Sequence, residues 1–129
     1  MVDFVAAPAD YAAAARPGFL TIAQNAAPLA LDYPGHPGNV DGIGQEELCF
    51  YATDAPRPED SGDDEGRREP EDCLDLFLAA GGLVPTVDCC DETEKIDYAY
   101  SRSAGRGYVP CCTTVELDEL RINPGHEPD

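Results

Sequence analysis

The stretch IDYAYSRSAGRGYVPCCTTVEL (residues 96–117) carries the pattern on which our sequence-based fold class depends. Two runs rich in β-forming residues flank RSAGRG, a glycine-containing loop of the kind that joins antiparallel strands. Tyr98, Tyr100 and Tyr108 would pack against one another across such a pair of strands. The stretch therefore predicts a β-hairpin.

Other segments with β-forming character precede this hairpin. The run 83–90 (LVPTVDCC) predicts a strand, and 46–53 (EELCFYAT) predicts a core strand. The runs 19–24 (FLTIAQ) and 28–33 (PLALDY) predict a further strand and an extended piece. Pro110, which has no amide donor, indicates an edge strand or a bulge.

Two segments predict short helices instead. Residues 8–16 (PADYAAAAR) place a proline near the first turn, and a Pro-Gly pair follows as a stop. Residues 70–80 (PEDCLDLFLAA) place a proline and two acids in the first turn, although the alternation LDLFL also allows a strand. The predicted fold class is mainly β, a small antiparallel sheet or sandwich with one or two short helices and an extended N-terminal arm.

Charge is distributed unevenly along the 129 residues, whose formal net charge is −18. Residues 1–45 contain four acidic and one basic side chain, whereas residues 46–129 contain 22 and seven. Because carboxylates mark solvent-facing surface, we expect 1–45 to be a low-charge arm lying along another surface. We expect 46–129 to be a compact, acidic, β-rich body with a mobile acidic loop at 54–72. Calcium binding by this loop is a weaker alternative, because its spacing misses the EF-hand pattern.

The arm is expected to dock through apolar side chains, either on the body or on a neighbouring subunit. Its prolines and glycines are too frequent for one long core element. The predicted interface residues are Phe4, Tyr11, Phe19, Leu20, Ile22, Leu29, Leu31 and Tyr33.

The excess of acidic over basic side chains favours some classes of protein over others. Salt screens repulsion among carboxylates, and the composition resembles that of proteins from extreme halophiles, chiefly haloarchaea and their viruses. An ordinary acidic protein and a nucleic-acid mimic are the alternatives. Direct nucleic-acid binding is not expected, because there is no basic patch. No apolar run predicts a membrane helix, and the first residues lack the features of a secretory signal.

The six cysteines leave several interpretations open. Disulfides or partly buried thiols are expected at Cys49, Cys73, Cys89, Cys90, Cys111 and Cys112, and the sequence does not select a connectivity. A small metal-binding domain built on the adjacent pairs, Cys89 with Cys90 and Cys111 with Cys112, is the weaker alternative because zinc sites usually use CxxC turns. His36 and His126 lie in Gly/Pro-rich segments and are expected to be solvated rather than ligands.

Catalytic motifs do not stand out in the sequence. A catalytic Ser or Cys needs a nearby general base, and the sequence offers only two histidines for that role. The glycine-rich stretches match no phosphate-binding pattern. We therefore predict a non-enzymatic structural or assembly protein without a cofactor, such as a head, tail or connector component of a halophilic virus. An acidic regulatory or mimic protein is the alternative.

The expected partners follow from this prediction. They are other protein subunits in a homo- or hetero-oligomer, with neither nucleic acid nor membrane. The expected location is the virion after assembly in the host cytoplasm, or otherwise the cytoplasm.

Overall fold

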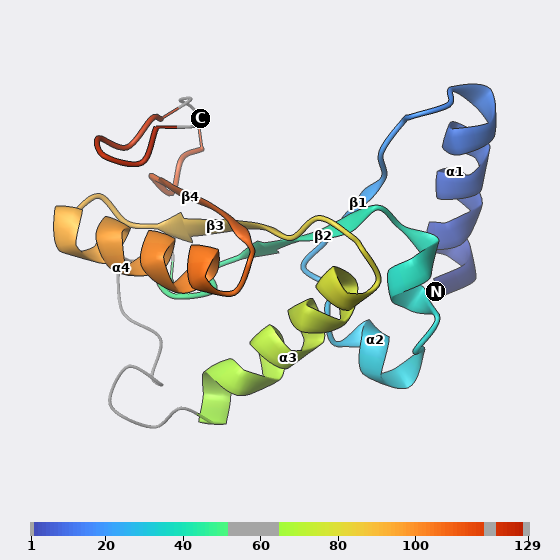
Figure 1. The fold of residues 1–129 in the computed structure, drawn as a ribbon, viewed down its shortest axis with the longest axis horizontal. Coiled ribbons are helices and arrows are strands. Elements are labelled where there is room, and N and C mark those ends of the chain that lie inside the picture. The colour runs from blue at the N-terminus through green and yellow to red at the C-terminus, as the bar shows by residue number, and fades with distance from the viewer. Residues whose placement is uncertain (1, 52–64, 118–120, 128–129) are drawn as a thin grey trace.

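The computed structural model describes residues 2–51, 65–117 and 121–127 and has an α/β fold (Figure 1). Helices and strands alternate along the chain. The elements are α1 (Val2–Ala15), β1 (Ile22–Gln24), α2 (Leu29–Asp32), the 3₁₀ helix η1 (His36–Asn39), β2 (Gly42–Glu46), α3 (Glu65–Ala79), β3 (Pro85–Cys89), α4 (Thr93–Gly105) and β4 (Val109–Thr113).

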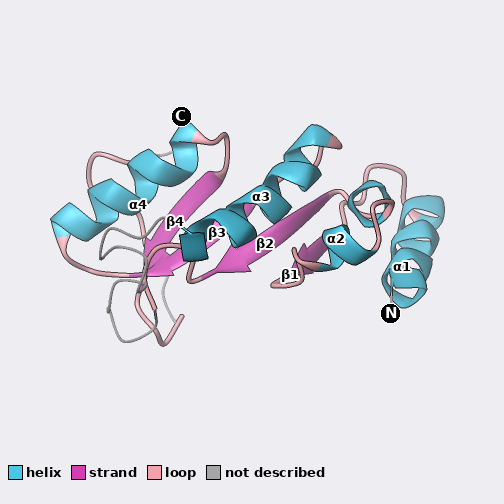
Figure 2. Cartoon of the chain, turned by 90° about the horizontal axis from the view of Figure 1, so that it is seen from below, coloured by secondary structure: helices cyan, strands magenta, loops and turns pink. Residues whose placement is uncertain are grey.

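The four strands form one sheet, in which every neighbouring pair is parallel and the order β1-β2-β3-β4 repeats the order in the chain. Helices α3 and α4 lie on the same side of this sheet (Figure 1, Figure 2). On that side the hydroxyls of Thr86 in β3 and Ser103 in α4 are 3.2 Å apart, and Ile43 of β2 shares the core with Phe77 of α3. The predicted mainly-β antiparallel sheet or sandwich is therefore wrong.

The predicted hairpin fails at its first strand. Residues 96–101 lie inside α4, where the buried side chains of Ile96, Ala99 and Ser103 recur at helical spacing. The loop RSAGRG is the end of that helix, since Gly107 adopts a φ of 87° and its amide donates back into the last turn. Strand β4 runs parallel to β3 because a helix, rather than a tight turn, connects them.

Two other predicted extended segments are also corrected. Residues 28–33 contain α2 instead of an extended piece. Residues 52–53 of the core strand predicted at 46–53 lie outside the described residues. Over 46–51 the strand does not form, because β2 ends at Glu46 and Glu47 has a φ of 55°, which extended backbone cannot adopt.

Several predicted elements are confirmed with shifted ends. Strands β1 and β3 lie within 19–24 and 83–90, and Pro110 stands in β4 at the edge of the sheet. The helices predicted at 8–16 and 70–80 belong to α1 and α3, each of which begins earlier.

The charge-based division of the chain also changes in the structure. The extended arm expected over 1–45 is wrong, because residues 2–45 form α1, β1, α2, η1 and most of β2. Residues 54–64 of the acidic loop predicted at 54–72 lie outside the described residues, and the chain is helical from Glu65 onward. Residues 1–45 therefore carry little charge because they supply two strands of the sheet, β1 and β2, and the helices that precede and join them.

His36 lies in the core rather than in solvent as predicted. Its side chain is fully buried, and its ring meets the ring of Phe77 edge-on, with 5.6 Å between the centroids. Neither ring nitrogen has a hydrogen-bond partner among the described residues. Burial lowers the pKa of His36 below its ordinary value of 6.5, because the charged ring would lose its hydration.

We expect the stability of the protein to fall with acidification through this histidine. The unfolded chain binds a proton near pH 6.5, whereas folded His36 resists it, so stability is present above that pH and decreases below it. The slope contributed by one such group approaches about 1.4 kcal/mol per pH unit. Guanidinium unfolding of the wild type and of His36→Leu at pH 8, 7, 6 and 5 checks this. The variant should lose less stability between pH 7 and 5, and parallel curves would contradict the assignment.

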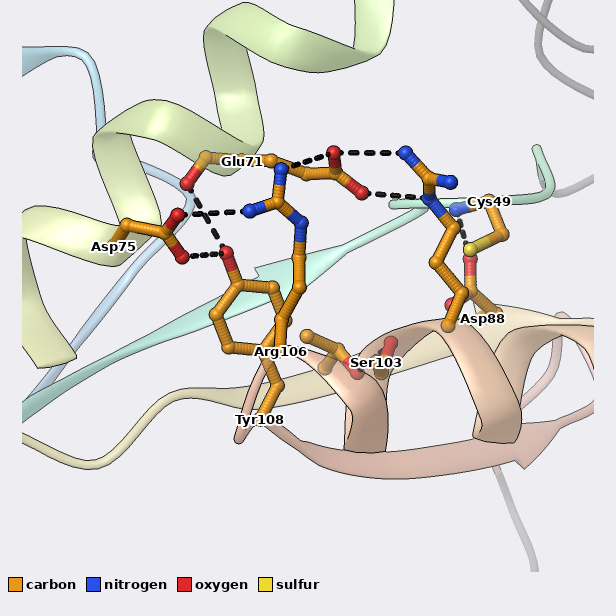
Figure 3. A network of polar contacts seen from close by, with 9 residues as sticks. Cys49, Glu71, Asp75, Asp88, Ser103, Arg106 and Tyr108 are labelled. Atoms are coloured by element: carbon orange, nitrogen blue, oxygen red, sulfur yellow. Dashed lines mark hydrogen bonds and ion pairs between the residues drawn. The ribbon is translucent and has the colours of Figure 1, made fainter.

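Helices α3 and α4 are joined by a buried ion-pair network (Figure 3). The Glu71 carboxylate, which is fully buried, accepts hydrogen bonds from Arg102 Nε at 2.7 Å and Nη2 at 2.9 Å, and from Arg106 Nη2 at 2.8 Å. The Tyr108 hydroxyl donates to Asp75 Oδ1 at 2.6 Å. Burial, and next the contact with Asp75, raises the pKa of Tyr108. The network therefore fixes the two helices against each other and against the start of β4.

Asp88 makes a second buried polar connection on the helix side of β3 (Figure 3). Its side chain is 1% exposed, and Oδ1 accepts the backbone amides of Cys49 at 2.6 Å and Phe50 at 2.9 Å. These amides belong to the segment that follows β2, where the chain has left the sheet. Asp88 therefore holds that segment against β3.

Gly42 has no room for a side chain. The amide of its neighbour Ile43 donates to the Leu83 carbonyl at 2.9 Å, and the Leu83 amide donates to the Asp41 carbonyl at 2.8 Å. A Cβ atom at position 42 would overlap the Leu83 carbonyl oxygen. This close approach sets the start of β2 against the chain that enters β3.

Candidate functional site

The carboxyl ends of parallel strands meet at one edge of a sheet, where open α/β sheets bind their ligands. In this protein Asn25 follows β1, Glu46 and Glu47 lie at the end of β2, and Cys89 ends β3. The edge therefore gathers polar and acidic residues that are far apart in the sequence.

Asn25 and Glu46 form a reciprocal pair across β1 and β2. Asn25 Oδ1 accepts the Glu46 amide at 2.8 Å, and Asn25 Nδ2 donates to Glu46 Oε2 at 3.0 Å. The Asn25 amide also donates to the Gly44 carbonyl at 2.9 Å, with Asn25 at a φ of 54°. The second carboxylate oxygen of Glu46, Oε1, receives no hydrogen bond from the described residues. A ligand that reaches this edge can therefore meet an oriented carboxylate.

Glu47 adds a second carboxylate and a second unusual backbone conformation. Its φ is 55°, and its amide donates to the Val87 carbonyl at 2.8 Å. Left-handed non-glycine residues cost free energy and occur preferentially at functional sites. Asn25 and Glu47 place two such residues at the ends of neighbouring strands.

The pKa of the Cys89 thiol shows that this edge is negatively charged. Burial raises the pKa of its thiol, and the charges of Glu47, Asp88 and Glu46 raise it further. The thiol is therefore a weak nucleophile at neutral pH. The same negative charges oppose the approach of an anionic ligand.

An open pocket of about 320 Å³ extends this edge beyond β3 and β4. It is lined by Cys89, Cys90, Asp91, Thr113, Thr114, Val115 and Glu116. Next to the Asn25–Glu46 pair, the side chain of Gln24 lies over Gly44, where a Cβ atom would meet Gln24 Oε1. Amides, carboxylates and hydroxyls thus dominate the polar groups of the edge.

The residues predicted as an interface lie elsewhere. Leu29 is half-buried, whereas the other seven are exposed: Phe4, Tyr11, Phe19, Leu20, Ile22, Leu31 and Tyr33. Docking through these side chains stays a prediction.

The six cysteines are reduced thiols in the structure. Cys49, Cys73, Cys90 and Cys112 are buried, and Cys89 and Cys111 are half-buried. A hydrogen bond with Cys90, together with burial, raises the pKa of Cys112, and burial raises that of Cys111. The described residues contain no cluster of three or more histidine, cysteine or acidic side chains that could hold a metal ion.

The remaining polar candidates have structural contacts. His126 stacks on Tyr100 with ring centroids 4.0 Å apart, and its Nε2 lies 2.8 Å from Asp97 Oδ1. Arg102 and Arg106, in and just after the last turn of α4, bind Glu71 on the helix side of the sheet. Within the described ranges, no helix is both long and apolar enough to cross a membrane.

Comparison with known proteins identifies a longer relative. No family model and no solved structure matches the chain. An uncharacterized protein of Deinococcus radiodurans is 34% identical to it over 123 residues. The match covers 95% of this chain and 38% of the relative, so the chain spans well under half of that relative's length.

Sequence reasoning missed the strand-end residues Asn25, Glu46 and Glu47. Glu46 was placed at the start of a strand, whereas it ends one. A parallel-sheet interpretation would have found them, because a polar residue directly after each buried strand is the signal for a site at this edge.

Proposed function

We propose that the carboxyl edge of the sheet binds an uncharged, hydroxyl-rich ligand of the carbohydrate class, on which Glu46 acts as an acid–base group. The observation that carries this proposal is the Asn25–Glu46 pair, which holds one carboxylate oxygen and leaves Oε1 without a partner among the described residues. Side-chain amides and carboxylates are good hydrogen-bond partners for hydroxyl groups, since they supply donors and acceptors at fixed positions.

Electrostatics supports an uncharged ligand over a phosphorylated one. The nearby charges of Glu46, Glu47 and Asp88 are all negative. Arg102 and Arg106, which could attract an anion, are engaged by Glu71. The whole chain carries a net charge of −18, which also disfavours an anionic ligand.

Hydrolysis of a glycosidic bond is the reaction that fits these groups best. Enzymes of this type usually use two carboxyl groups, one as acid and one as base or nucleophile. Glu46 and Glu47 supply two carboxylates at one strand end, and we assign the proton transfer to Glu46 because Asn25 orients it. Such a positioned group contributes about 10²–10⁴-fold to rate.

Kinetics with 4-nitrophenyl glycosides of neutral hexoses tests the proposal, with 4-nitrophenyl phosphate as the anionic comparison. Glu46→Gln should lower kcat/KM by about 100-fold or more, and Asn25→Ala by about tenfold. Asp10→Asn, which changes an exposed carboxylate on α1, is the matched control and should be silent. Glycoside turnover that Glu46→Gln leaves unchanged would reject the assignment.

Ligand binding is measured separately from turnover. Titration with neutral oligosaccharides should shift the NMR signal of the Glu46 backbone amide, which donates to Asn25 Oδ1, and this shift should be smaller in Asn25→Ala. Absence of both binding and turnover, or preference for the phosphate ester, would reject the ligand class.

A further inference from the structure

Helix α1 presents an apolar face to solvent. Figure 1 and Figure 2 both place α1 at the end of the molecule opposite α4, and it packs there on η1. Val2 and Ala9 are the buried residues of α1, whereas Phe4 is 78% and Tyr11 is 77% exposed. Among the described residues, these two rings are the most exposed of the large hydrophobic side chains.

The outward residues of α1 follow the period of the helix. Four exposed residues recur at spacings of three and four positions and therefore form one stripe along the helix. They are Phe4, Ala7, Tyr11 and Ala14, and we call them the α1 stripe. Along the stripe, each aromatic ring is followed by an alanine, so large and small side chains alternate.

The contacts of α1 within one copy are few for a helix of its length. Helices shorter than about 12–15 residues are marginal on their own in water, and a proline inside a helix removes a backbone hydrogen bond. Helix α1 has 14 residues, contains Pro8 and buries only Val2 and Ala9. Exposed apolar patches of this kind mark interaction sites on soluble proteins. A second surface packed on the α1 stripe would therefore stabilise the helix.

The distribution of charge favours a second copy of this chain as that surface. Residues 1–45 contain four acidic and one basic side chain, although the whole chain has a net charge of −18. Two copies that meet at α1 therefore keep most of their negative charge away from the contact. A lipid surface fits less well, because helices that bind it are rich in Lys and Arg, whereas α1 contains Asp3 and Asp10 and no basic residue.

The α1 stripe is complementary to itself when two copies of the helix run antiparallel. With a two-fold axis level with position 9, Phe4 of one copy and Ala14 of the other both lie about 7.5 Å from that level. Tyr11 and Ala7 of the other copy both lie about 3 Å from it. Each ring therefore meets a small side chain, and the symmetry makes every contact twice. A parallel pair would instead set ring against ring.

The two rings supply most of the area that such a pair can bury. Each keeps more than three-quarters of its surface exposed in one copy. An aromatic side chain buries about 150–250 Å², so the four rings of two copies bury on the order of 500–800 Å². The smaller side chains beside them raise the total to about 1,000 Å², the size at which specific interfaces begin.

We propose that two copies of this chain associate through the α1 stripe, with the two α1 helices antiparallel. Phe4 packs against Ala14 of the other copy, and Tyr11 packs against Ala7. The modest area makes the dimer weak, with a dissociation constant in the micromolar range. The proposal concerns α1 alone and stands independently of the ligand class proposed above.

Sedimentation equilibrium of the 129-residue chain, between about 10 µM and about 1 mM, tests the association. The average mass should rise with concentration from 13.8 kDa toward twice that value. Tyr11→Glu places a charge in the apolar contact and should weaken the dimer at least about tenfold. Ile122→Glu, a matched change at a residue that is 65% exposed outside α1, should have no effect. A mass of 13.8 kDa at every concentration, or a dimer that only Ile122→Glu weakens, would overturn the proposal.

Exchanging a large and a small residue tests the antiparallel register. Ala14→Phe sets a ring against Phe4 of the other copy and should weaken the dimer at least about tenfold. Adding Phe4→Ala to the same chain returns a small side chain opposite each ring and should restore the dissociation constant to within about threefold. Circular dichroism checks that both variants keep the fold. A folded double variant that does not regain the dimer would overturn the antiparallel arrangement.

Discussion

Replacing Glu71 by alanine is expected to lower the free energy of unfolding by about 3 kcal/mol. The substitution leaves Arg102 without the buried carboxylate and leaves Arg106 paired only with Asp75, whose Oδ2 lies 2.8 Å from Nη1. Removing one partner of a buried ion pair costs about 3–5 kcal/mol. The lower end applies because the Arg102 and Arg106 side chains are 29% and 30% exposed and keep part of their hydration. Urea unfolding followed by circular dichroism measures the change.

The same helix supplies the control for this experiment. Asp72 is the next residue along α3 and is exposed, so Asp72→Ala should change stability by no more than about 0.5 kcal/mol. Glu71→Gln keeps the shape and one acceptor oxygen but replaces the other oxygen with an NH2 donor, so its effect should fall between the two. Equal effects of Glu71→Ala and Asp72→Ala would show that the network does not hold the helices together.

Replacing Asp88 by alanine is expected to cost about 2–4 kcal/mol. The substitution removes the acceptor for the Cys49 and Phe50 amides, and each buried donor left without a partner costs about 1–3 kcal/mol. Asp88→Asn retains an acceptor oxygen in the same place and should cost less. Chemical denaturation at neutral pH provides the measurement.

The local origin of this effect can be checked as well. In Asp88→Ala, the amides of Cys49 and Phe50 should exchange with solvent faster than those of β3 itself. Asp91→Ala changes an exposed acid just beyond the same strand and should leave both stability and exchange unchanged. Slow exchange at Cys49 and Phe50 in the alanine variant would contradict the proposed role of Asp88.

The fold could be predicted from the sequence only where local signals agreed with the packing. The proline and two acids at its first turn favoured a helix at 70–80, although the alternation LDLFL also allowed a strand, and the β-branched run at 83–90 predicted β3. The segment around Tyr98 carries β-forming residues that also fit a helix with Ile96, Ala99 and Ser103 inward. Packing on β3 and β4 selects the helix there, and this tertiary contact is not visible in a single segment.

The candidate site could not be predicted because its parts are joined only by the sheet. Asn25 and Glu46 are 21 positions apart, and their pairing depends on β1 and β2 lying parallel in register. The absence of a motif led to the prediction of a non-enzymatic protein, which stays untested, as does the virion assignment. A search for linear motifs does not detect site residues, such as Asn25 and Glu46, that come together only where neighbouring strands end.

The tight approach at Gly42 has a consequence for sequence variation. The Cβ atom of alanine, the smallest replacement, would overlap the Leu83 carbonyl oxygen. The hydrogen bonds that Leu83 makes with Ile43 and Asp41 would then have to move. Among natural variants of this protein, position 42 should therefore be glycine even where most surrounding residues have diverged. A homologue with another residue there should carry a compensating insertion or deletion between α3 and β3.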